Sequence, residues 1–437
     1  MYWLYSALLA AGLLLSLPYW LLESARHGKY RAGLVDRLGK VPHRLSHDPH
    51  LPAIWVHAVS VGEVIAVTGL TFELRGRFPQ HRIVVSTTTA TGQKIARERF
   101  GEDSVFYFPL DMPFAIRPYL QRLRPELIVL AETEFWPNFL RLAHLSGAKV
   151  AVVNARISDS SLPGYRRFRS IMTRILRDVD LFLAQTEQDS SRLQDIGAQP
   201  ERIEISGNLK FDAPIPAPPA IVDNLRLALE GANADPILVC GSTMDGEESL
   251  LLQAFENILV SHPAAVMILA PRHPERFTEV AELLRRLNVR FWRRSEWRGE
   301  PISGGVLLLD SIGELAALYS LSDVAFVGGS LVPKGGHNII EPAQFGVPIV
   351  VGNHTENFRD IVGLFQSRNA VRIVTPAELP LVFMELLSND AERAAVGRRA
   401  AETLRSQMGA THKTIEALRG LLITAPAADD QITAPRG

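Results

Sequence analysis

Short apolar segments alternate with amphipathic segments along most of the chain. In the first half, the apolar segments cover residues 53–59, 82–87, 127–131, 149–154, 181–185 and 202–206. In the second half, they cover residues 236–241, 265–270, 306–310, 324–328 and 348–352. Buried strands that alternate with helices are typical of a parallel sheet with helices on both faces. The pattern therefore predicts an α/β protein with two Rossmann-like domains.

A proline-rich segment separates the two series of strands. The run Ala-Pro-Ile-Pro-Ala-Pro-Pro within residues 213–220 lacks the amide donors that a helix or a central strand needs. We therefore predict a stiff linker there, between an N-terminal domain over residues 23–212 and a C-terminal domain over residues 221–421. A helix over residues 390–421 is expected to close the fold, and residues 422–437 are predicted to form a disordered tail.

The N-terminal segment has the pattern of a membrane anchor. Residues 1–22 carry no charged side chain, and at helical rise they are just long enough to cross the hydrocarbon core of a bilayer. Basic residues follow, so the positive-inside rule places the rest of the chain in the cytoplasm; they are Arg26, Lys29, Arg31, Arg37 and Lys40. A secretory signal fits less well because no lysine or arginine precedes the apolar run. Aromatic residues in the segment equally allow a helix that lies in the membrane interface.

Composition narrows the choice of partners. A single cysteine, Cys240, excludes an internal disulfide framework and a multi-cysteine metal site. The net charge of -1 argues against non-specific nucleic-acid binding. A local cluster at Arg166, Arg167 and Arg169 is either a solvated helix face or a contact for anionic lipid headgroups. We expect no metal, because the pair Asp178-Val-Asp180 joins a helix end to a strand instead of following one.

A glycine-rich loop lies between two apolar strands in residues 325–352. Its sequence Gly-Gly-His-Asn-Ile-Ile-Glu ends at Glu341, and a helix is expected to begin near Asn338 and to end at Gly346. Glycines and a helix N-terminus can bring backbone N–H groups to a phosphate, and Glu341 could accept hydrogen bonds from ribose hydroxyls. The pattern favours a nucleotide-sugar site. The alternative is an ordinary strand-loop-helix corner in which Glu341 binds amides of its own first turn.

Polar motifs follow several of the predicted strands. They are Ser60-Val-Gly-Glu63, Glu132-Thr-Glu-Phe-Trp-Pro-Asn138, Gly207-Asn-Leu-Lys-Phe-Asp212, Pro271-Arg-His-Pro-Glu-Arg276 and Ser311-Ile-Gly-Glu314. Ligands of open parallel sheets bind beyond the carboxyl ends of the strands, so we expect these motifs at a cleft between the domains. The two motifs with serine three residues before glutamate also match a helix capping box.

Taken together, the motifs resemble those of the lipid A Kdo transferases, and the resemblance covers nearly the whole chain. These membrane-associated enzymes move 3-deoxy-D-manno-octulosonic acid (Kdo) from its cytidine monophosphate donor, CMP-Kdo, to a lipid A precursor, lipid IVA. The resemblance implies a GT-B fold in which an acceptor domain and a donor domain face each other across a cleft. It also implies an inverting glycosyltransferase of lipopolysaccharide biosynthesis that needs no cofactor and works at the cytoplasmic side of the inner membrane.

The resemblance also implies roles for individual residues. Glu63 would be the catalytic base, and Glu132 and Lys210 would stabilise the transition state. The CMP contacts would be Pro271, Arg272, Ile312, Gly313, Glu314, Asn338, Ile339, Ile340 and Glu341. Apart from the resemblance, the reaction itself needs such groups, because a departing nucleoside monophosphate needs fixed cations or amides and an attacking hydroxyl needs a base.

Three other functions fit parts of the pattern. A transferase that uses a uridine diphosphate sugar, or a sugar-nucleotide epimerase, would share the two domains and the glycine-rich loop. An epimerase has no need of a membrane anchor. A non-catalytic, membrane-tethered nucleotide-binding module is the remaining alternative, and the carboxylates after the strands argue against it.

Overall fold

The computed structural model of the 437-residue chain describes residues 1–27, 33–46, 51–212 and 220–423. The predicted linker, except for residue 220, and the predicted tail from residue 424 lie outside the described residues, as do Lys29 and Arg31. The chain divides into two compact units: unit 1 contains Met1–Ala213 with Met408–Gly437, and unit 2 contains Pro214–Gln407.

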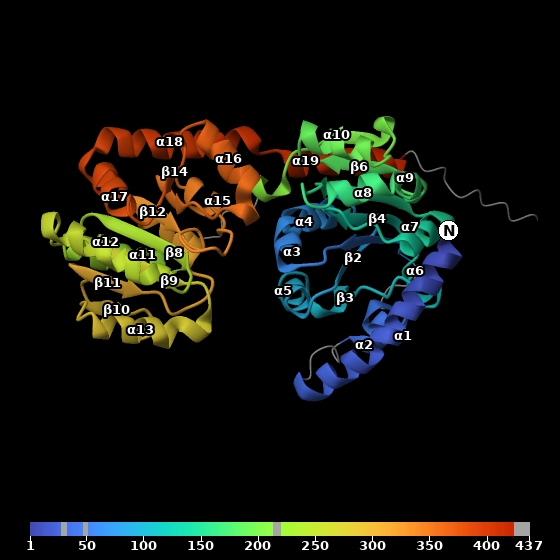
Figure 1. The fold of residues 1–437 in the computed structure, drawn as a ribbon, viewed down its shortest axis with the longest axis horizontal. Helices are drawn as coiled ribbons and strands as arrows, with labels where there is room; N and C mark the ends of the chain where they lie inside the picture. The colour runs from blue at the N-terminus through green and yellow to red at the C-terminus, as the bar shows by residue number, and fades with distance from the viewer. Residues whose placement is uncertain (28–32, 47–50, 213–219, 424–437) are drawn as a thin grey trace, which may run out of the picture. The chain divides into compact units, whose positions relative to one another are not determined.

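Unit 1 is built on a seven-stranded parallel sheet (Figure 1). The strand order is β3-β2-β1-β4-β5-β6-β7. The strands are β1 Ala53–His57, β2 Arg82–Thr87, β3 Val105–Tyr107, β4 Pro125–Ala131, β5 Lys149–Ala155, β6 Leu181–Ala184 and β7 Ile203–Ile205. Most of their side chains are buried, because helices cover both faces of a parallel sheet. On one face, Trp55 is the centre of an aromatic cluster that includes Phe106 and Phe139, with ring centroids 5.3 and 5.0 Å away.

Helices flank this sheet on both sides (Figure 1). They are α1 Tyr2–His27, α2 Leu34–Arg37, α3 Val61–Ala66, α4 Thr68–Arg77, α5 Ala90–Phe100, α6 Pro113–Leu123, α7 Pro137–Leu145, α8 Leu162–Arg167, α9 Arg169–Leu176, α10 Glu187–Asp195 and α19 Ala410–Ile423. Side-chain N-caps fix the starts of three of them, because Ser60, Thr89 and Thr186 accept backbone N–H groups of α3, α5 and α10.

Unit 2 repeats the architecture with the strand order β10-β11-β9-β8-β12-β13-β14. Its strands are β8 Ile237–Thr243, β9 Val266–Pro271, β10 Phe291–Arg293, β11 Gly305–Leu308, β12 Val324–Val327, β13 Ile349–Gly352 and β14 Arg372–Val374. Its helices are α11 Ala220–Gly231, α12 Glu247–Ser261, α13 Phe277–Arg286, α14 Leu315–Leu318, α15 Ile340–Ala343, α16 Arg359–Ser367, α17 Leu379–Ser388 and α18 Asp390–Gln407. The predicted α/β class with two Rossmann-like halves is confirmed.

The end of the chain differs from the expectation. The single helix expected over residues 390–421 is two helices, α18 and α19, separated at Gly409, whose φ of 102° ends a helix. Gly409 N–H donates to Asp212 at 2.7 Å, and α19 packs on the sheet of unit 1 through Ala410, Ile415 and Leu418. Residues 408–421 therefore belong to the first unit and not, as expected, to the C-terminal domain.

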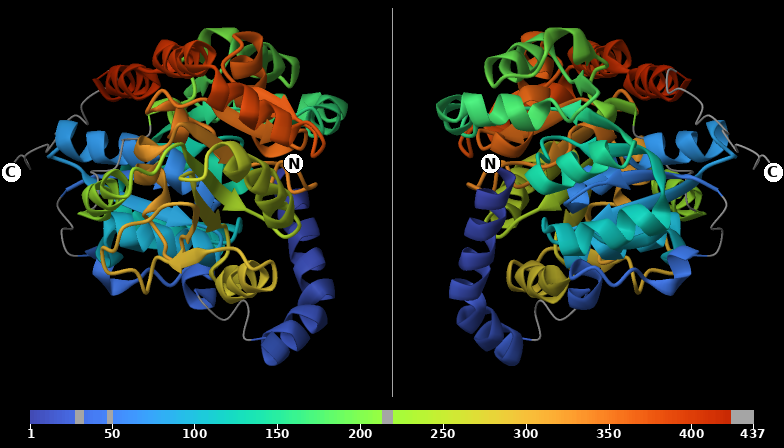
Figure 2. Two further views of the ribbon diagram at one scale, coloured as in Figure 1. Left: turned by 90° about the vertical axis from the view of Figure 1, so that its left-hand side faces the viewer. Right: turned by 90° about the vertical axis from the view of Figure 1, so that its right-hand side faces the viewer.

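The N-terminal segment forms the helix α1, whose first turns are bound to unit 1. Tyr2 Oη donates to Asp178 Oδ2 at 3.0 Å, and Asn138 Nδ2 donates to Ser6 Oγ at 3.0 Å. Asn138 is in α7 and Asp178 follows α9, and Figure 2 shows α1 as one continuous helix at the edge of unit 1. Among the helices that the structure describes, none combines the length and apolarity that crossing a membrane requires. The transmembrane span expected over residues 1–22 is therefore not supported, since its first turns instead direct polar groups onto the domain.

Candidate active site

The strand order of unit 1 places two of the predicted motifs side by side. Strands β1 and β4 are neighbours in parallel register, with His57 opposite Leu130. The chain leaves β1 toward β2 on one side and leaves β4 toward β5 on the other, so this is the topological switch point where parallel sheets bind ligands. The Ser60–Glu63 motif follows β1, and the motif that begins at Glu132 follows β4.

Glu63 lies in the first turn of α3 and is held by the residues before that helix. Its Oε1 accepts the Ser60 hydroxyl at 2.8 Å, and its Oε2 accepts the Val59 N–H at 2.8 Å. Ser60 Oγ accepts the Glu63 N–H at 3.4 Å, so the capping box is formed. Burial raises the pKa of Glu63, the bonds from Ser60 and Val59 oppose the shift, and the charge of Glu132 adds to it. Each carboxylate oxygen keeps a further lone pair, so capping does not prevent Glu63 from accepting a proton.

Glu132 and Lys210 form an ion pair at the end of β4. Glu132 Oε1 lies 3.7 Å from Lys210 Nζ, and the two side chains are 28% and 24% exposed. Glu132 takes a left-handed φ of 57° and donates its N–H to Val153 O at 2.9 Å. That backbone conformation costs a non-glycine residue about 1–2 kcal/mol, and such strain is concentrated at functional sites. Lys210 lies in the 3₁₀ turn η4, Leu209–Asp212. The fold thus brings together two of the predicted catalytic residues.

Glu134 adds a third carboxyl group to this site. Burial, and then the charges of Glu63 and Glu132, raise the pKa of Glu134 to about 7, although the polar Trp136 side chain opposes the shift. Two carboxylates disfavour a third negative charge beside them. At neutral pH, Glu134 is therefore divided between its acid and carboxylate forms, and the site holds an exchangeable proton.

Aromatic rings pack beside these groups at the end of β1. His57 is fully buried, and its ring stacks on Phe108 with the centroids 3.9 Å apart. Phe108 also packs near Trp136, with the centroids 6.1 Å apart. Burial lowers the pKa of His57 to about 3, so its ring is neutral at physiological pH. His57 is therefore a packing residue at the end of β1, next to the aromatic ring of Phe108.

A buried carboxylate fills the loop at the switch point of unit 2, between β8 and β12. Glu247, the first residue of α12, accepts the N–H groups of Gly329, Ser330 and Leu331 at 2.7, 2.9 and 2.9 Å. It also accepts the Met244 N–H at 2.8 Å. These N–H groups are engaged within the protein. They are therefore not available to a phosphate, and none of them belongs to the Gly335–Glu341 part of the loop.

Five polar residues of unit 2 gather after β9 and β12. Burial lowers the pKa of His337, and the nearby charges of Arg272 and His273 add to the shift, while a bond with the Gly328 carbonyl opposes it. Burial raises the pKa of Glu341, and Asn338 and Arg272 oppose that shift. Asn338 Nδ2 donates to Glu341 Oε1 at 3.2 Å. The predicted donor residues Arg272, Asn338 and Glu341 are thus neighbours in the structure.

The helix after the glycine-rich loop is shorter than expected. The helix α15 is a single turn, Ile340–Ala343, and it begins two residues after Asn338, whose Oδ1 accepts the Ile340 N–H at 3.1 Å. One turn carries little macrodipole, so the cation Arg272 is the stronger electrostatic feature for a phosphate. Ile339, Ile340 and Pro271 are buried, and they can offer a ligand only backbone groups.

The predicted Ile312–Glu314 contact is a turn that follows β11. Ile312 is exposed, and Gly313 has a φ of 90°. Arg294 donates to both carboxylate oxygens of Glu314, at 3.1 and 2.8 Å, and the Ser311 hydroxyl bonds the same carboxylate. The Glu314 carboxylate is therefore already bound to Arg294 and Ser311, so the group that this turn can offer a ligand is its backbone. Arg294 was not predictable as a site residue, because nothing in the sequence pairs it with Glu314.

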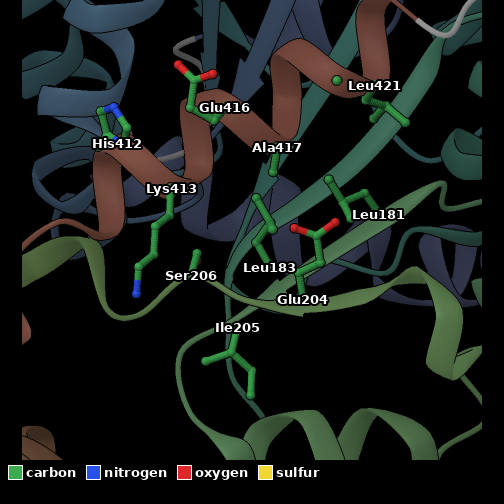
Figure 3. A pocket seen from close by; sticks show the side chains of 11 residues that line it. Leu181, Leu183, Glu204, Ile205, Ser206, His412, Lys413, Glu416, Ala417 and Leu421 are labelled. Carbon is green, nitrogen blue, oxygen red and sulfur yellow. The ribbon is translucent and has the colours of Figure 1, made fainter.

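Two other features are separate from these sites. Asp178 binds Tyr2, and Asp180 Oδ2 accepts the Val150 N–H at 2.8 Å, so each carboxylate of the Asp-Val-Asp pair has its own structural contact. An open groove of about 740 Å³ lies in unit 1 between β6, β7 and α19. Figure 3 shows Leu183 and Ala417 directed toward each other across it. None of the predicted site residues lines this groove.

Comparisons with known proteins show to which family the chain belongs. A model of the family described as 3-deoxy-D-manno-octulosonic-acid transferase (kdotransferase) matches residues 32–213. A 3-deoxy-D-manno-octulosonic acid transferase of Haemophilus influenzae is 34% identical over 406 residues, which cover 92% of this chain and 94% of that protein.

Two solved structures share the fold at low identity. A glycosyltransferase of Rickettsia africae is 14% identical with a TM-score of 0.55, and the match covers 86% of this chain and 100% of that one. A UDP-GlcNAc 2-epimerase of Neisseria meningitidis is 13% identical with a TM-score of 0.55, and the match covers 85% and 100%. At such identity the likeness shows only the fold, a GT-B-like pair of Rossmann-like units that transferases and epimerases share.

Proposed function

The chain belongs to the 3-deoxy-D-manno-octulosonic acid transferase family, and we propose that it moves Kdo from CMP-Kdo to a lipid A precursor such as lipid IVA. The family makes it a glycosyltransferase of lipopolysaccharide biosynthesis. The observation that carries the proposal is the site at the switch point of unit 1, where Glu63 lies near the Glu132–Lys210 ion pair. A base beside a fixed cation is what sugar transfer from a nucleotide requires.

In the proposed reaction, Glu63 takes the proton of an acceptor hydroxyl. The acceptor oxygen forms a bond to the anomeric carbon of Kdo as the bond from that carbon to the phosphate oxygen breaks, and CMP leaves with the electron pair. Attack opposite to the leaving phosphate inverts the anomeric carbon. Lys210 and Arg272 are the cations that would stabilise the developing negative charge, and the raised pKa of Glu63 makes its carboxylate a stronger base.

For the donor, we propose that Arg272 and the Asn338–Glu341 segment bind CMP together with Pro271 and the Ile312–Glu314 turn. The support is their proximity after β9 and β12, where Arg272 acts on both His337 and Glu341.

The direct test of the proposed reaction is to incubate the purified protein and a lipid A precursor with CMP-Kdo or with UDP-GlcNAc. We expect the lipid to gain the mass of one or more Kdo residues with CMP-Kdo as the donor, and to gain no mass with UDP-GlcNAc. Conversion of UDP-GlcNAc without any lipid product would instead establish an epimerase.

We further propose that the protein works at the cytoplasmic face of the inner membrane, with α1 lying in the membrane interface. Tyr2 and Ser6 face unit 1, whereas Trp3, Leu4 and Leu8 are 91%, 66% and 65% exposed. An exposed apolar helix face next to a cation, here Arg141 with its guanidinium 5.6 Å from the Tyr2 ring centroid, fits a surface of anionic lipid. Vesicle flotation tests this: Trp3→Ser with Leu8→Ser should reduce binding to anionic vesicles, and Leu145→Ser, at an exposed leucine of α7, is the control. Unchanged binding would contradict the role of α1.

A further inference from the structure

In unit 1, a residue with left-handed backbone directly follows β4, and another is the next-to-last residue of β5. Ala131 and Val153 are paired in register, and the residues that follow them, Glu132 and Asn154, have φ values of 57° and 54°. Strand β5 is irregular between Val152 and Ala155. Such an irregularity re-aims one side chain at the end of a strand. The side chain that it re-aims here is that of Asn154, which is fully buried.

Asn154 connects this strand end to the turn that carries Lys210. Its Oδ1 accepts the Leu209 N–H at 3.0 Å, a buried contact with the residue directly before Lys210. Its backbone oxygen accepts the Gln185 Nε2 hydrogen at 3.0 Å. Among the described residues, Asn154 Nδ2 has no hydrogen-bond partner. A glycine would take the same backbone conformation without burying an amide, so the bond to Leu209 is the contact for which this side chain is suited.

We infer that Asn154 is a positioning residue that holds Lys210 against Glu132. The inference rests on the proposed function, in which that ion pair stabilises the transition state. Glu132 is fixed by its N–H bond to Val153, and Lys210 is fixed through Leu209 by the next residue of the same strand. One strand end therefore sets both partners of the 3.7 Å ion pair. A displacement of about 1 Å in such a constellation can cost about 100-fold in rate.

The test compares three substitutions. Asn154→Gly removes the acceptor but keeps the backbone conformation, Asn154→Asp keeps an acceptor oxygen, and Asn288→Gly is a matched control at another left-handed asparagine, with a φ of 54°. We expect Asn154→Gly to speed amide hydrogen exchange at Leu209 and to lower kcat about tenfold or more, with the KM for CMP-Kdo nearly unchanged. Asn154→Asp should retain the protection of Leu209 and most of the turnover. Asn288→Gly should match the wild type.

A double substitution separates positioning from a general loss of structure. If Asn154 acts through Lys210, Asn154→Gly should have little further effect on kcat in a Lys210→Ala background, because effects on one interaction are not additive. Multiplied effects, or an unchanged kcat for Asn154→Gly despite faster exchange at Leu209, would overturn the inference. If the wild type transfers no Kdo, the proposed function fails. The exchange at Leu209 then decides by itself whether Asn154 holds the turn.

Discussion

In unit 1, the strand ends at the switch point carry the carboxyl groups of Glu63, Glu132 and Glu134, and burial with mutual repulsion raises the pKa of Glu134 to about 7. In unit 2, two carboxylates that follow strands, Glu247 after β8 and Glu314 after β11, are bound within the protein. Four backbone N–H groups hold Glu247, and Arg294 holds Glu314. The polar groups near the glycine-rich loop also include one arginine, Arg272, and two histidines, His273 and His337.

The difference shows how one architecture serves two kinds of chemistry. A carboxyl group with a raised pKa exchanges protons near neutral pH, which suits the removal of a proton from a sugar hydroxyl. Burial raises the pKa of Glu247 too, but its four backbone N–H partners oppose that shift and tie its oxygens to the loop, so its role is structural. We therefore expect substitution of Glu63 in unit 1 to impair chemistry, whereas substitution of Glu247 in unit 2 should impair stability.

The largest effect is expected from Glu247→Ala. It leaves buried N–H groups without an acceptor, at about 1–3 kcal/mol each before water compensates, so we expect a loss of about 3–5 kcal/mol in the free energy of unfolding of unit 2. Urea unfolding followed by circular dichroism measures it. The control is Glu256→Ala, at an exposed position of the same helix. Equal stability of the two variants would refute the structural role of Glu247.

Glu63→Gln should impair turnover instead of stability. Glutamine still offers an oxygen to the capping box but cannot take a proton, so we expect kcat to fall about 100-fold or more while the melting temperature stays within a few degrees. Kdo transfer to a lipid acceptor and thermal unfolding are the two measurements, with Glu73→Gln on the exposed face of α4 as the control. Near-normal turnover would leave Glu63 as a helix cap and make Glu132 the next residue to test as the base.

Arg272→Ala should weaken the binding of CMP without affecting the fold. The loss of a hydrogen bond to a charged group costs about 1–3 kcal/mol, which calorimetry with CMP can detect. Arg286→Ala, at an exposed position of α13, controls for the general loss of one positive charge. If both variants bind CMP as the wild type does, Arg272 is not part of the donor site.

The smallest effect concerns pH. The pKa of Glu134 is raised from 4.5 to about 7, so folding favours the protonated form. The stability that this group contributes is fully present below about pH 4.5 and is lost as the pH rises through 7. When the pH is raised from about 4.5 to 7, the unfolding free energy of the wild type should therefore fall more than that of Glu134→Gln, by a difference on the order of 1–2 kcal/mol. Parallel pH dependences for the two proteins would show that Glu134 titrates normally.

Most strands were predictable because long apolar runs identify buried parallel strands. The strands that were not predicted are β3, β10 and β14, which have three residues each and lie at sheet edges. Three residues show a pattern only weakly, and of the described strands of that length only β7 was predicted. The glutamates after β1 and β4 were also predictable, because motifs at strand ends are visible in the sequence.

The sequence by itself determined the two-domain α/β architecture and the polar motifs after the strands, because both depend on local pattern. Only the tertiary structure decided which partners those motifs meet. It paired Lys210 with Glu132, placed Asn154 on the turn before Lys210, and filled the first turn of the glycine-rich loop with the Glu247 carboxylate. These contacts join residues far apart in the chain, and strand order and backbone conformation bring them together.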